Sequence, residues 1–381
     1  MQILFLASPL VNTKGGALTV IQNLLQNFSA QVRPVYLGSF TDMAEIFRDN
    51  GADTHAARPG FEPVKKRNIL LFPFSVLSGI VYLFRHRRLF ARSDVIVQAT
   101  SFTEVFTVLP WLLLFTQKPV VVCVHTACRR AVYANPLLPL LKYVWKHPQT
   151  TVVYVSQAQA ATWQERGICA RKPRVVHNGT KVSSLSKKLK RTGSVRFAFV
   201  GRIHREKGLE TLLEAFSLVS LDRPAELLFV GDGADRAYFT QKFAELTRAL
   251  PLLKVRWVGF VPNPKKYLRQ ADFTFFPSKE EAFGLGIIES WERGVAVIAS
   301  DLEVFKEIHQ RARISQELLF KTQNPADLAR IIQSVLDTQI LAKYRGPALA
   351  SSLHETVERK FSVQKMTKTY EELFAALTKA N

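Results

Sequence analysis

Short apolar runs alternate with amphipathic stretches along almost the whole chain, and this alternation restricts the possible folds more than any other feature of the sequence. A typical run is Val120–Val124, which is apolar throughout. Strands of this kind are buried on both faces, as in a parallel sheet covered by helices. Their alternation with helical segments is typical of repeated βαβ units. The sequence therefore predicts an α/β protein with doubly wound parallel sheets.

The predicted strands fall into two groups separated by a polar segment. The first group is Ile3–Ala7, Val32–Leu37, Asp94–Gln98, Val120–Val124 and Thr151–Val155; the second is Arg196–Val200, Ala225–Val230, Lys254–Val258, Phe273–Phe276 and Ala296–Ala299. Helical periodicity fills the intervals. Because 381 residues are too many for one ordinary core, we expect two domains. They are residues 1–178 and 196–360, joined by a Ser-rich basic linker at 179–195, with a helix at about 361–381 that packs back on the first domain.

The chain is strongly basic, with a net charge of +21. Such a charge attracts nucleic acid, anionic lipid or anionic substrates, and alone it does not choose among them. Nucleic-acid binding requires basic residues interleaved with exposed aromatic residues, or a recognition helix, and the sequence contains neither pattern. The cysteines Cys123, Cys128 and Cys169 form no C-x-x-C pair, and no basic region precedes the first apolar run. The cysteine spacing predicts structural thiols, and the N-terminal pattern predicts a cytoplasmic location. Because both nucleic-acid-binding patterns are missing, we expect no nucleic-acid partner.

One segment, from Arg58 to Arg92, combines two basic clusters with an uncharged run. The run Ile69–Phe84 falls short of the ~20 residues that span a bilayer. The basic residues around it are Arg58, Lys65, Lys66, Arg67, Arg85, Arg87, Arg88 and Arg92. This pattern fits a contact with an anionic membrane surface, with cations on the head groups and apolar side chains at the acyl boundary. The alternative is a buried helix of the first domain with solvated basic ends.

Candidate ligand-binding residues follow the predicted strands, because open parallel sheets bind ligands at the carboxyl ends of their strands. Gly15 and Gly16 follow the first strand and precede a helix, which suits the approach of an anion or an ordinary tight turn. They do not form the G-x-G-x-x-G motif of dinucleotide enzymes. Arg202 and Lys207 follow Arg196–Val200, where two cations can hold and neutralise a diphosphate. A solvated basic loop is the alternative.

Two glutamates follow Phe273–Phe276 and enclose a Gly-rich turn. Glu281 and Glu289 have Gly284 and Gly286 between them, at the predicted start of a helix. Backbone N–H groups there can face a phosphate, while carboxylates accept hydrogen bonds from sugar or ribose hydroxyls. His125 follows a Val-rich strand, where it is either a site residue or a core histidine. We expect no metal, because the sequence has neither a D-x-D motif nor histidines at metal-ligand spacing.

These motifs together resemble the retaining glycosyltransferase family 4, which has the GT-B fold. In the second half the matching residues are Gly201-Arg202, Lys207-Gly208, the run LLEAF, VGDG at Val230–Gly233, VGFVP at Val258–Pro262 and EAFGLGIIE at Glu281–Glu289. The first half resembles the family more loosely, through Gly15-Gly16, His125 and Val176–Gly179. The resemblance implies two tandem Rossmann-like domains that face each other across a cleft. The second would bind the nucleotide-sugar.

The resemblance also implies a role for each matching residue in the transfer of a sugar from a UDP- or GDP-linked donor, with retention and without a metal or other cofactor. Arg202 and Lys207 would bind the donor diphosphate, Glu281 the hydroxyls of the donor sugar and Glu289 the ribose. The backbone of Phe283, Gly284, Leu285 and Gly286 would line the sugar-phosphate, and Gly259, Phe260 and Val261 would lie against the base. Gly201 would lie beside the phosphates, which Gly15 and Gly16 would approach from the first domain. His125 would face the donor sugar or the acceptor.

One position departs from the family pattern: Ser300-Asp301 is followed by Leu302-Glu303, where many relatives have Gly-Gly. The departure bears on donor choice. We expect a lipid-linked glycan acceptor in bacterial cell-surface polysaccharide or lipopolysaccharide biosynthesis, at the inner face of the membrane. Two alternatives are a sugar-nucleotide epimerase of the same fold and a basic, non-enzymatic protein that binds nucleic acid or membrane. Incubation with a donor distinguishes them by product.

Overall fold

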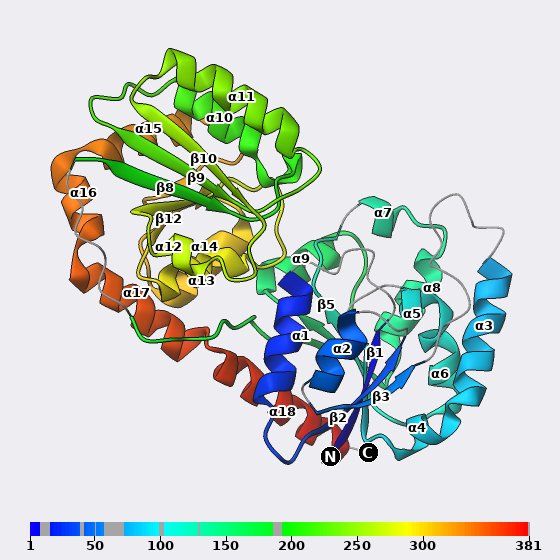
Figure 1. The fold of residues 1–381 in the computed structure, drawn as a ribbon. Helices are drawn as coiled ribbons and strands as arrows, with labels where there is room; N and C mark the ends of the chain where they lie inside the picture. Colours follow the sequence, from blue (N-terminus) through cyan, green and yellow to red (C-terminus); the bar gives the residue numbers. More distant parts are fainter. Residues whose placement is uncertain are drawn as a thin grey trace. The chain divides into compact units, whose positions relative to one another are not determined.

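The computed structural model describes residues 1–7, 16–38, 42–49, 51–56, 72–98, 103–128, 130–185 and 193–379. The chain divides into two compact units, one of Met1–Gly179 with Val363–Asn381 and one of Thr180–Ser362. Each unit is a parallel sheet with helices packed against it (Figure 1). The predicted α/β class with two doubly wound sheets is confirmed. None of the described helices is both long enough and apolar enough to cross a membrane.

The first unit is built on a seven-stranded sheet in the order β3-β2-β1-β4-β5-β6-β7. Its strands are β1 (Gln2–Ala7), β2 (Arg33–Gly38), β3 (Asp53–Ala56), β4 (Val95–Gln98), β5 (Val120–Val124), β6 (Thr150–Tyr154) and β7 (Pro173–Val175). The neighbouring strands β4, β5 and β6 are buried along their whole length, as expected for a parallel sheet that is covered on both faces.

Ten helices of the described residues surround this sheet. They are α1 (Gly16–Asn27), α2 (Asp42–Asp49), α3 (Phe72–Arg85), α4 (Arg87–Arg92), α5 (Thr103–Thr107), α6 (Leu109–Phe115), α7 (Arg130–Tyr133), α8 (Leu138–Lys146), α9 (Gln157–Glu165) and α18 (Val363–Lys379).

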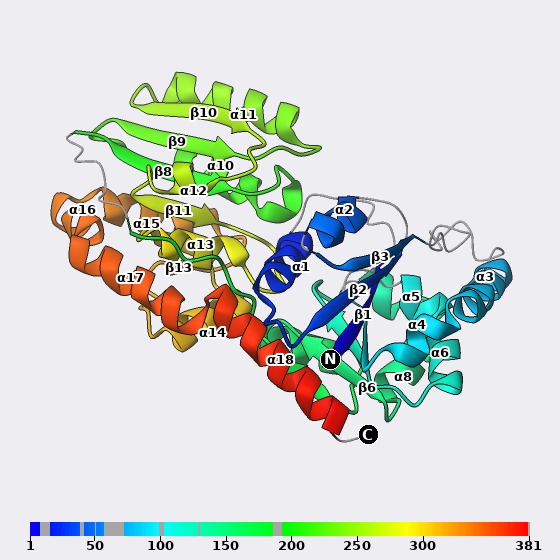
Figure 2. The same ribbon diagram turned by 60° about the horizontal axis from the view of Figure 1, so that its bottom comes forward.

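The last of these helices, α18, comes from the end of the chain and lies beside α1 (Figures 1 and 2). Its Tyr370 and Phe374 are buried, and the Phe374 ring lies 6.4 Å from that of Phe28. The backbone N–H of Ser29 donates to the Glu371 carboxylate at 2.6 Å. The first unit is therefore completed by a segment that is distant in sequence.

The second unit has a six-stranded sheet in the order β10-β9-β8-β11-β12-β13. The strands are β8 (Val195–Val200), β9 (Ala225–Val230), β10 (Leu253–Gly259), β11 (Phe273–Phe276), β12 (Ala296–Ser300) and β13 (Leu319–Phe320). The helices are η2 (Arg205–Lys207, a single 3-10 turn), α10 (Leu209–Ser217), α11 (Arg236–Ala249), α12 (Lys265–Leu268), α13 (Leu285–Glu292), α14 (Glu303–Ala312), α15 (Pro325–Leu336), α16 (Thr338–Arg345) and α17 (Pro347–Lys360).

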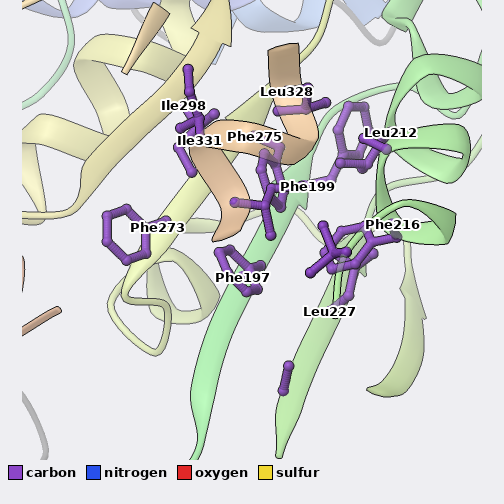
Figure 3. Packing of buried hydrophobic residues seen from close by; sticks show 14 of the residues in the cluster. Phe197, Phe199, Leu212, Phe216, Leu227, Phe273, Phe275, Ile298, Leu328 and Ile331 are labelled. Carbon is purple, nitrogen blue, oxygen red and sulfur yellow. The ribbon is translucent and has the colours of Figure 1, made fainter. Parts of the chain in front are cut away.

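Aromatic and aliphatic side chains together fill the core on one face of this second sheet (Figure 3). The Phe197 and Phe275 rings stack with centroids 5.1 Å apart, and Phe216 of α10 meets both rings edge-on. Such aromatic contacts add about 0.5–1.5 kcal/mol per pair to the free energy gained by burial alone. They fix the central strands, and therefore the loops at their carboxyl ends, in place.

All ten predicted strands occur, each within one residue of its predicted bounds. The strands that the sequence pattern missed are β3, β7 and β13, and each lies at an edge of its sheet. An edge strand is short and needs no continuous apolar content, so it lacks the signal on which the prediction depended. The final helix begins at Val363, directly after Ser362. The three cysteines are free; Cys123 and Cys128 are buried and Cys169 is exposed.

Candidate functional site

The strand order brings two of the predicted motifs to the same place on the second sheet. The chain runs from β8 outward to β9 and β10, and then returns to form β11 on the other side of β8. The loops after β8 and β11 therefore flank the point where the winding reverses, which is where doubly wound sheets bind ligands. Arg202 and Lys207 follow β8, and Glu281 follows β11.

The side chains of Lys207 and Glu281 form an ion pair, in which the ammonium group donates to Oε1. Both are largely buried, with 19% and 22% of their side chains exposed. The Ser278 hydroxyl donates to the same oxygen at 3.3 Å, and the Lys279 amide donates to the Glu206 carbonyl at 3.0 Å. The two loops are thus tied together. The sequence predicted both residues as site residues but not this pairing.

Gly208 explains why the turn that carries Lys207 lies so close to β11. Its φ of +69° is in the left-handed region, and a Cβ atom built on it would come 1.7 Å from the Pro277 carbonyl oxygen. No other residue fits without displacing that backbone. The glycine therefore sets the separation between the two loops.

Arg202 differs from its neighbour Arg205, although both are exposed cations in the same loop. Arg205 pairs with Glu210 at 3.3 Å and lies over the Tyr238 ring at 4.6 Å. Arg202 makes no hydrogen bond or ion pair within the described part of the chain. Its guanidinium is therefore available for an anion.

The start of α13 presents backbone N–H groups after the β11 loop. Gly284 has a φ of +102°, and a Cβ atom there would meet the Phe305 ring at 2.6 Å; at Gly286 it would meet the Phe276 ring at 2.3 Å. The Phe283 side chain is buried against Phe361, so this residue offers only its backbone. The Ile287 amide donates to the Gly284 carbonyl at 3.0 Å, whereas the amides of Leu285 and Gly286 have no acceptor within the helix. The helix dipole favours an anion at these two amides.

Glu289 lies in the second turn of α13 and its carboxyl is buried. Burial raises its pKa to about 7, helped by the nearby Glu292 and opposed by the Lys265 ammonium. Glu292, which is fully buried, pairs with Lys265 at 3.3 Å and Arg293 at 2.8 Å, and accepts from the Ser183 amide at 2.9 Å. The sequence prediction missed Lys265. The signal in the sequence was the pair Glu289 and Glu292, two acidic residues three positions apart on an apolar helix. Two buried carboxylates on one helix require a nearby cation.

The turns after β8, β9 and β10 are joined by backbone hydrogen bonds. Gly201 donates to the Val230 carbonyl at 3.0 Å, and Gly231 donates to the Gly259 carbonyl at 2.8 Å. Beyond Gly259, the Phe260 side chain is exposed and Val261 is half-buried. The β10 turn therefore offers an exposed aromatic side chain, which suits contact with a base.

The remaining predicted residues belong to the first unit. Gly16 begins α1, and Gly15 lies outside the described residues. His125 follows β5; its Nδ1 atom is buried without a hydrogen-bond partner in the described structure. Burial lowers its pKa to about 4, so the ring is neutral at pH 7. The approach of Gly16 and His125 to a donor stays a prediction.

No group of three or more His, Cys, Asp and Glu side chains in the described ranges is arranged to hold a metal ion. Cationic side chains near these strand ends include Arg202 and Lys207 after β8, and Lys265 at the start of α12.

Comparison with known proteins identifies matches over both units. The family model "Glycosyltransferase Family 4" matches residues 14–184, and the model "Glycosyl transferases group 1" matches residues 183–348. Crystal structures of Anabaena Alr3699/HepE with UDP and with UDP-glucose each superpose with a TM-score of 0.75 at 17% identity, covering 99% of this chain and 100% of that protein.

Two curated relatives match by sequence. The putative teichuronic acid biosynthesis glycosyltransferase TuaC of Bacillus subtilis is 31% identical over 48% of this chain and 42% of its own length. The O-antigen biosynthesis glycosyltransferase WclY of Escherichia coli is 24% identical over 44% of this chain and 43% of its own length. The chain thus spans less than half the length of these relatives.

Proposed function

Since the chain belongs to the family 4 type of GT-B glycosyltransferases, on models that together match residues 14–348, we propose that it transfers a sugar from a nucleotide-diphosphate donor to an acceptor glycan. The observation that carries this proposal is the arrangement at the reversal point of the second sheet. There the guanidinium of Arg202, which has no partner among the described residues, the Lys207–Glu281 pair and the N-terminus of α13 follow neighbouring strands. Together they offer two cations, a set of N–H donors and hydroxyl acceptors.

In the proposed complex Arg202 and Lys207 bind the diphosphate and neutralise it as it leaves. The backbone of residues 283–286 lines the sugar-phosphate, Glu281 accepts hydrogen bonds from sugar hydroxyls and Glu289 from the ribose. The turn of Gly259, Phe260 and Val261 lies against the base. The crystal structures of HepE with UDP and UDP-glucose support a nucleotide-sugar as the donor class.

We propose that the reaction retains the configuration at the anomeric carbon. The bond from that carbon to the diphosphate breaks, the acceptor oxygen attacks on the same face, and the departing phosphate takes the acceptor proton. Glu281 then binds hydroxyls and is not a nucleophile. Positive charge comes from Arg202 and Lys207 without a metal ion.

We further propose that the acceptor is lipid-linked and belongs to bacterial cell-surface polysaccharide or lipopolysaccharide assembly. TuaC and WclY, with names from teichuronic acid and O-antigen biosynthesis, support this class of pathway. The protein would work at the inner face of the cell membrane.

The test is a donor screen in EDTA with UDP- and GDP-sugars, followed by product NMR. Transfer of sugar supports the proposal, an epimerised donor would indicate the epimerase, and no turnover would favour a non-enzymatic role.

Arg202→Ala and Lys207→Ala should each lower kcat by roughly 100- to 1000-fold, as for loss of a preorganised charge-stabilising group. Arg205→Ala is the matched control, since this guanidinium is held by Glu210 and Tyr238. A β linkage from an α-linked donor would refute retention.

A further inference from the structure

Five large apolar side chains on two neighbouring helices of the first unit are exposed. They are Leu77, Val81 and Phe84 of α3, and Leu114 and Phe115 of α6, each between 57% and 73% exposed. The helices pack against each other, and the Phe84 and Phe115 ring centroids are 6.5 Å apart (Figure 1 shows α3 in cyan beside α6). The two groups therefore form one continuous surface, which we call the apolar ridge.

The exposure of the apolar ridge does not result from a loosely attached helix. Leu77, Val81 and Phe84 follow helical spacing and share one face of α3. The opposite face holds Gly79, where an added Cβ atom would come 2.0 Å from the Thr107 carbonyl oxygen, and Tyr82, whose hydroxyl donates to the Leu37 carbonyl at 3.3 Å. The helix is thus anchored in the core by one face, and its other face is apolar and solvent-facing.

A basic cluster directly follows the α3 part of the ridge. Arg85, Arg87, Arg88 and Arg92 are all exposed, and none forms an ion pair with a carboxylate that the structure describes. Between Phe72 and Lys118 the sequence has only two acidic residues, Asp94 and Glu104. Asp94 already accepts from the Gln2 amide at 2.7 Å. The surface beside the ridge is therefore strongly positive.

Apolar side chains bordered by arginines that form no ion pair with a described carboxylate match one partner in both respects, an anionic phospholipid surface. The rings and the aliphatic side chains would enter the acyl boundary, and the guanidinium groups would meet lipid phosphates. A second copy of the chain fits less well. A two-fold interface brings the same patch of both copies together, so it would place the two arginine clusters close to each other.

We propose that the apolar ridge and the four arginines form the membrane-docking surface of the protein, with the ridge inserted into the interface of an anionic bilayer. The proposal deepens the proposed function and rests on it for the membrane-bound acceptor. The docking itself requires no sugar transfer, so the two can fail separately. Vesicle binding without transfer would refute the proposed function alone, and transfer without vesicle binding would refute the docking surface alone.

The experiment is vesicle flotation of the full chain with phosphatidylcholine alone and with phosphatidylcholine mixed with phosphatidylglycerol. The protein should float with the anionic vesicles, and less so as salt rises. The double variant Phe84→Ala, Phe115→Ala should lower the partition coefficient by about tenfold or more, because two exposed rings lose their burial in lipid. Leu218→Ala is the matched control in the second unit, where Leu218 is as exposed as Phe84.

Charge is tested in the same way. Arg85→Gln, Arg87→Gln and Arg88→Gln together should lower binding to anionic vesicles by more than tenfold and leave binding to neutral vesicles unchanged. The control changes three exposed cations of the second unit, Arg248, Lys254 and Arg269, to Gln. Full binding by the ridge variant, or an equal loss in the controls, would overturn the proposal. The proposal would also be overturned if the protein did not bind vesicles and instead formed a concentration-dependent dimer that the ridge variant abolishes.

Discussion

Glu281 is the counter-ion of Lys207 in the structure, yet Lys207 is also the residue proposed to bind phosphate. An arriving diphosphate must therefore compete with Glu281 for the ammonium group. The carboxylate would keep Lys207 in position without ligand and weaken the hold on the product. The same pair thus affects both donor binding and product release.

This competition predicts that Glu281→Gln binds the free nucleoside diphosphate about three- to tenfold more tightly, consistent with coupling energies of about 1 kcal/mol for groups in contact. In a Lys207→Ala background the same change should have no effect. Glu280→Gln removes the same charge from an exposed neighbouring position and serves as the control. Calorimetric titration compares the wild type, Glu281→Gln, Lys207→Ala, the double variant and Glu280→Gln. Weaker binding in Glu281→Gln, or equal tightening with Lys207 absent, contradicts the competition.

The buried carboxyl of Glu289 predicts a pH dependence of donor binding. Its pKa of about 7 is above the ordinary value, so it gains a proton as the pH falls through neutrality. A ribose hydroxyl donates best to the ionised form, so donor affinity should fall as the pH drops from about 8 to 6. Glu289→Gln should flatten this profile. A nucleotide-sugar that lacks the ribose hydroxyls is the control, and a steep profile with that ligand would assign the titration to another group.

The sequence identified the types of residue at the candidate site but not their partners. Lys207 and Glu281 are 74 positions apart, and only the return of the chain to β11 brings them together. A local pattern contains no information on such a contact. The same holds for Lys265, which neutralises Glu292 from another helix.

Among the elements, the contact between the turn at Gly208 and the end of β11 controls the geometry of the site. Gly208→Ala would bring a methyl group onto the Pro277 carbonyl and also strain the left-handed backbone. The free energy of unfolding of the second unit should fall by about 1 kcal/mol for the backbone and a further 1–3 kcal/mol for the clash. Because the turn shifts, kcat should fall as well.

Gly193→Ala separates the two effects. Gly193 has a φ of +92° in the same unit, and an added Cβ atom would meet nothing within 4 Å. The free energy of unfolding of the Gly193→Ala variant should fall only by the backbone contribution, and its kcat should be unchanged. Thermal unfolding and turnover measure both variants, and equal losses would show that the contact with Pro277 is unimportant.

The sheets were predictable from sequence because the inner strands are mostly apolar, and Val120–Val124 is apolar throughout. Turn geometry was predictable only in part. A glycine in the pattern indicates a tight turn, but the requirement for Gly208 comes from Pro277, which is remote in sequence.

At the scale of the whole molecule, α18 contributes to the first unit although it follows the second in sequence. Phe374→Ala removes a buried ring that contacts Phe28 and Tyr370, and should lower the free energy of unfolding of the first unit by about 3–5 kcal/mol. Lys368→Ala, at an exposed position of the same helix, should change it by less than about 0.5 kcal/mol. Calorimetry should show the transition of the first unit shifted and that of the second unchanged; equal shifts would contradict this assignment.

The position of α18 also reverses the usual order of folding during synthesis. Domains generally fold as they leave the ribosome, the N-terminal one first. Here the second unit is the continuous segment Thr180–Ser362, whereas the first needs residues translated after it. The core of the first unit therefore remains incomplete during synthesis, although β1 is translated first, and the second unit can fold before it. Chaperones that bind nascent chains should accordingly occupy the N-terminal half until α18 emerges.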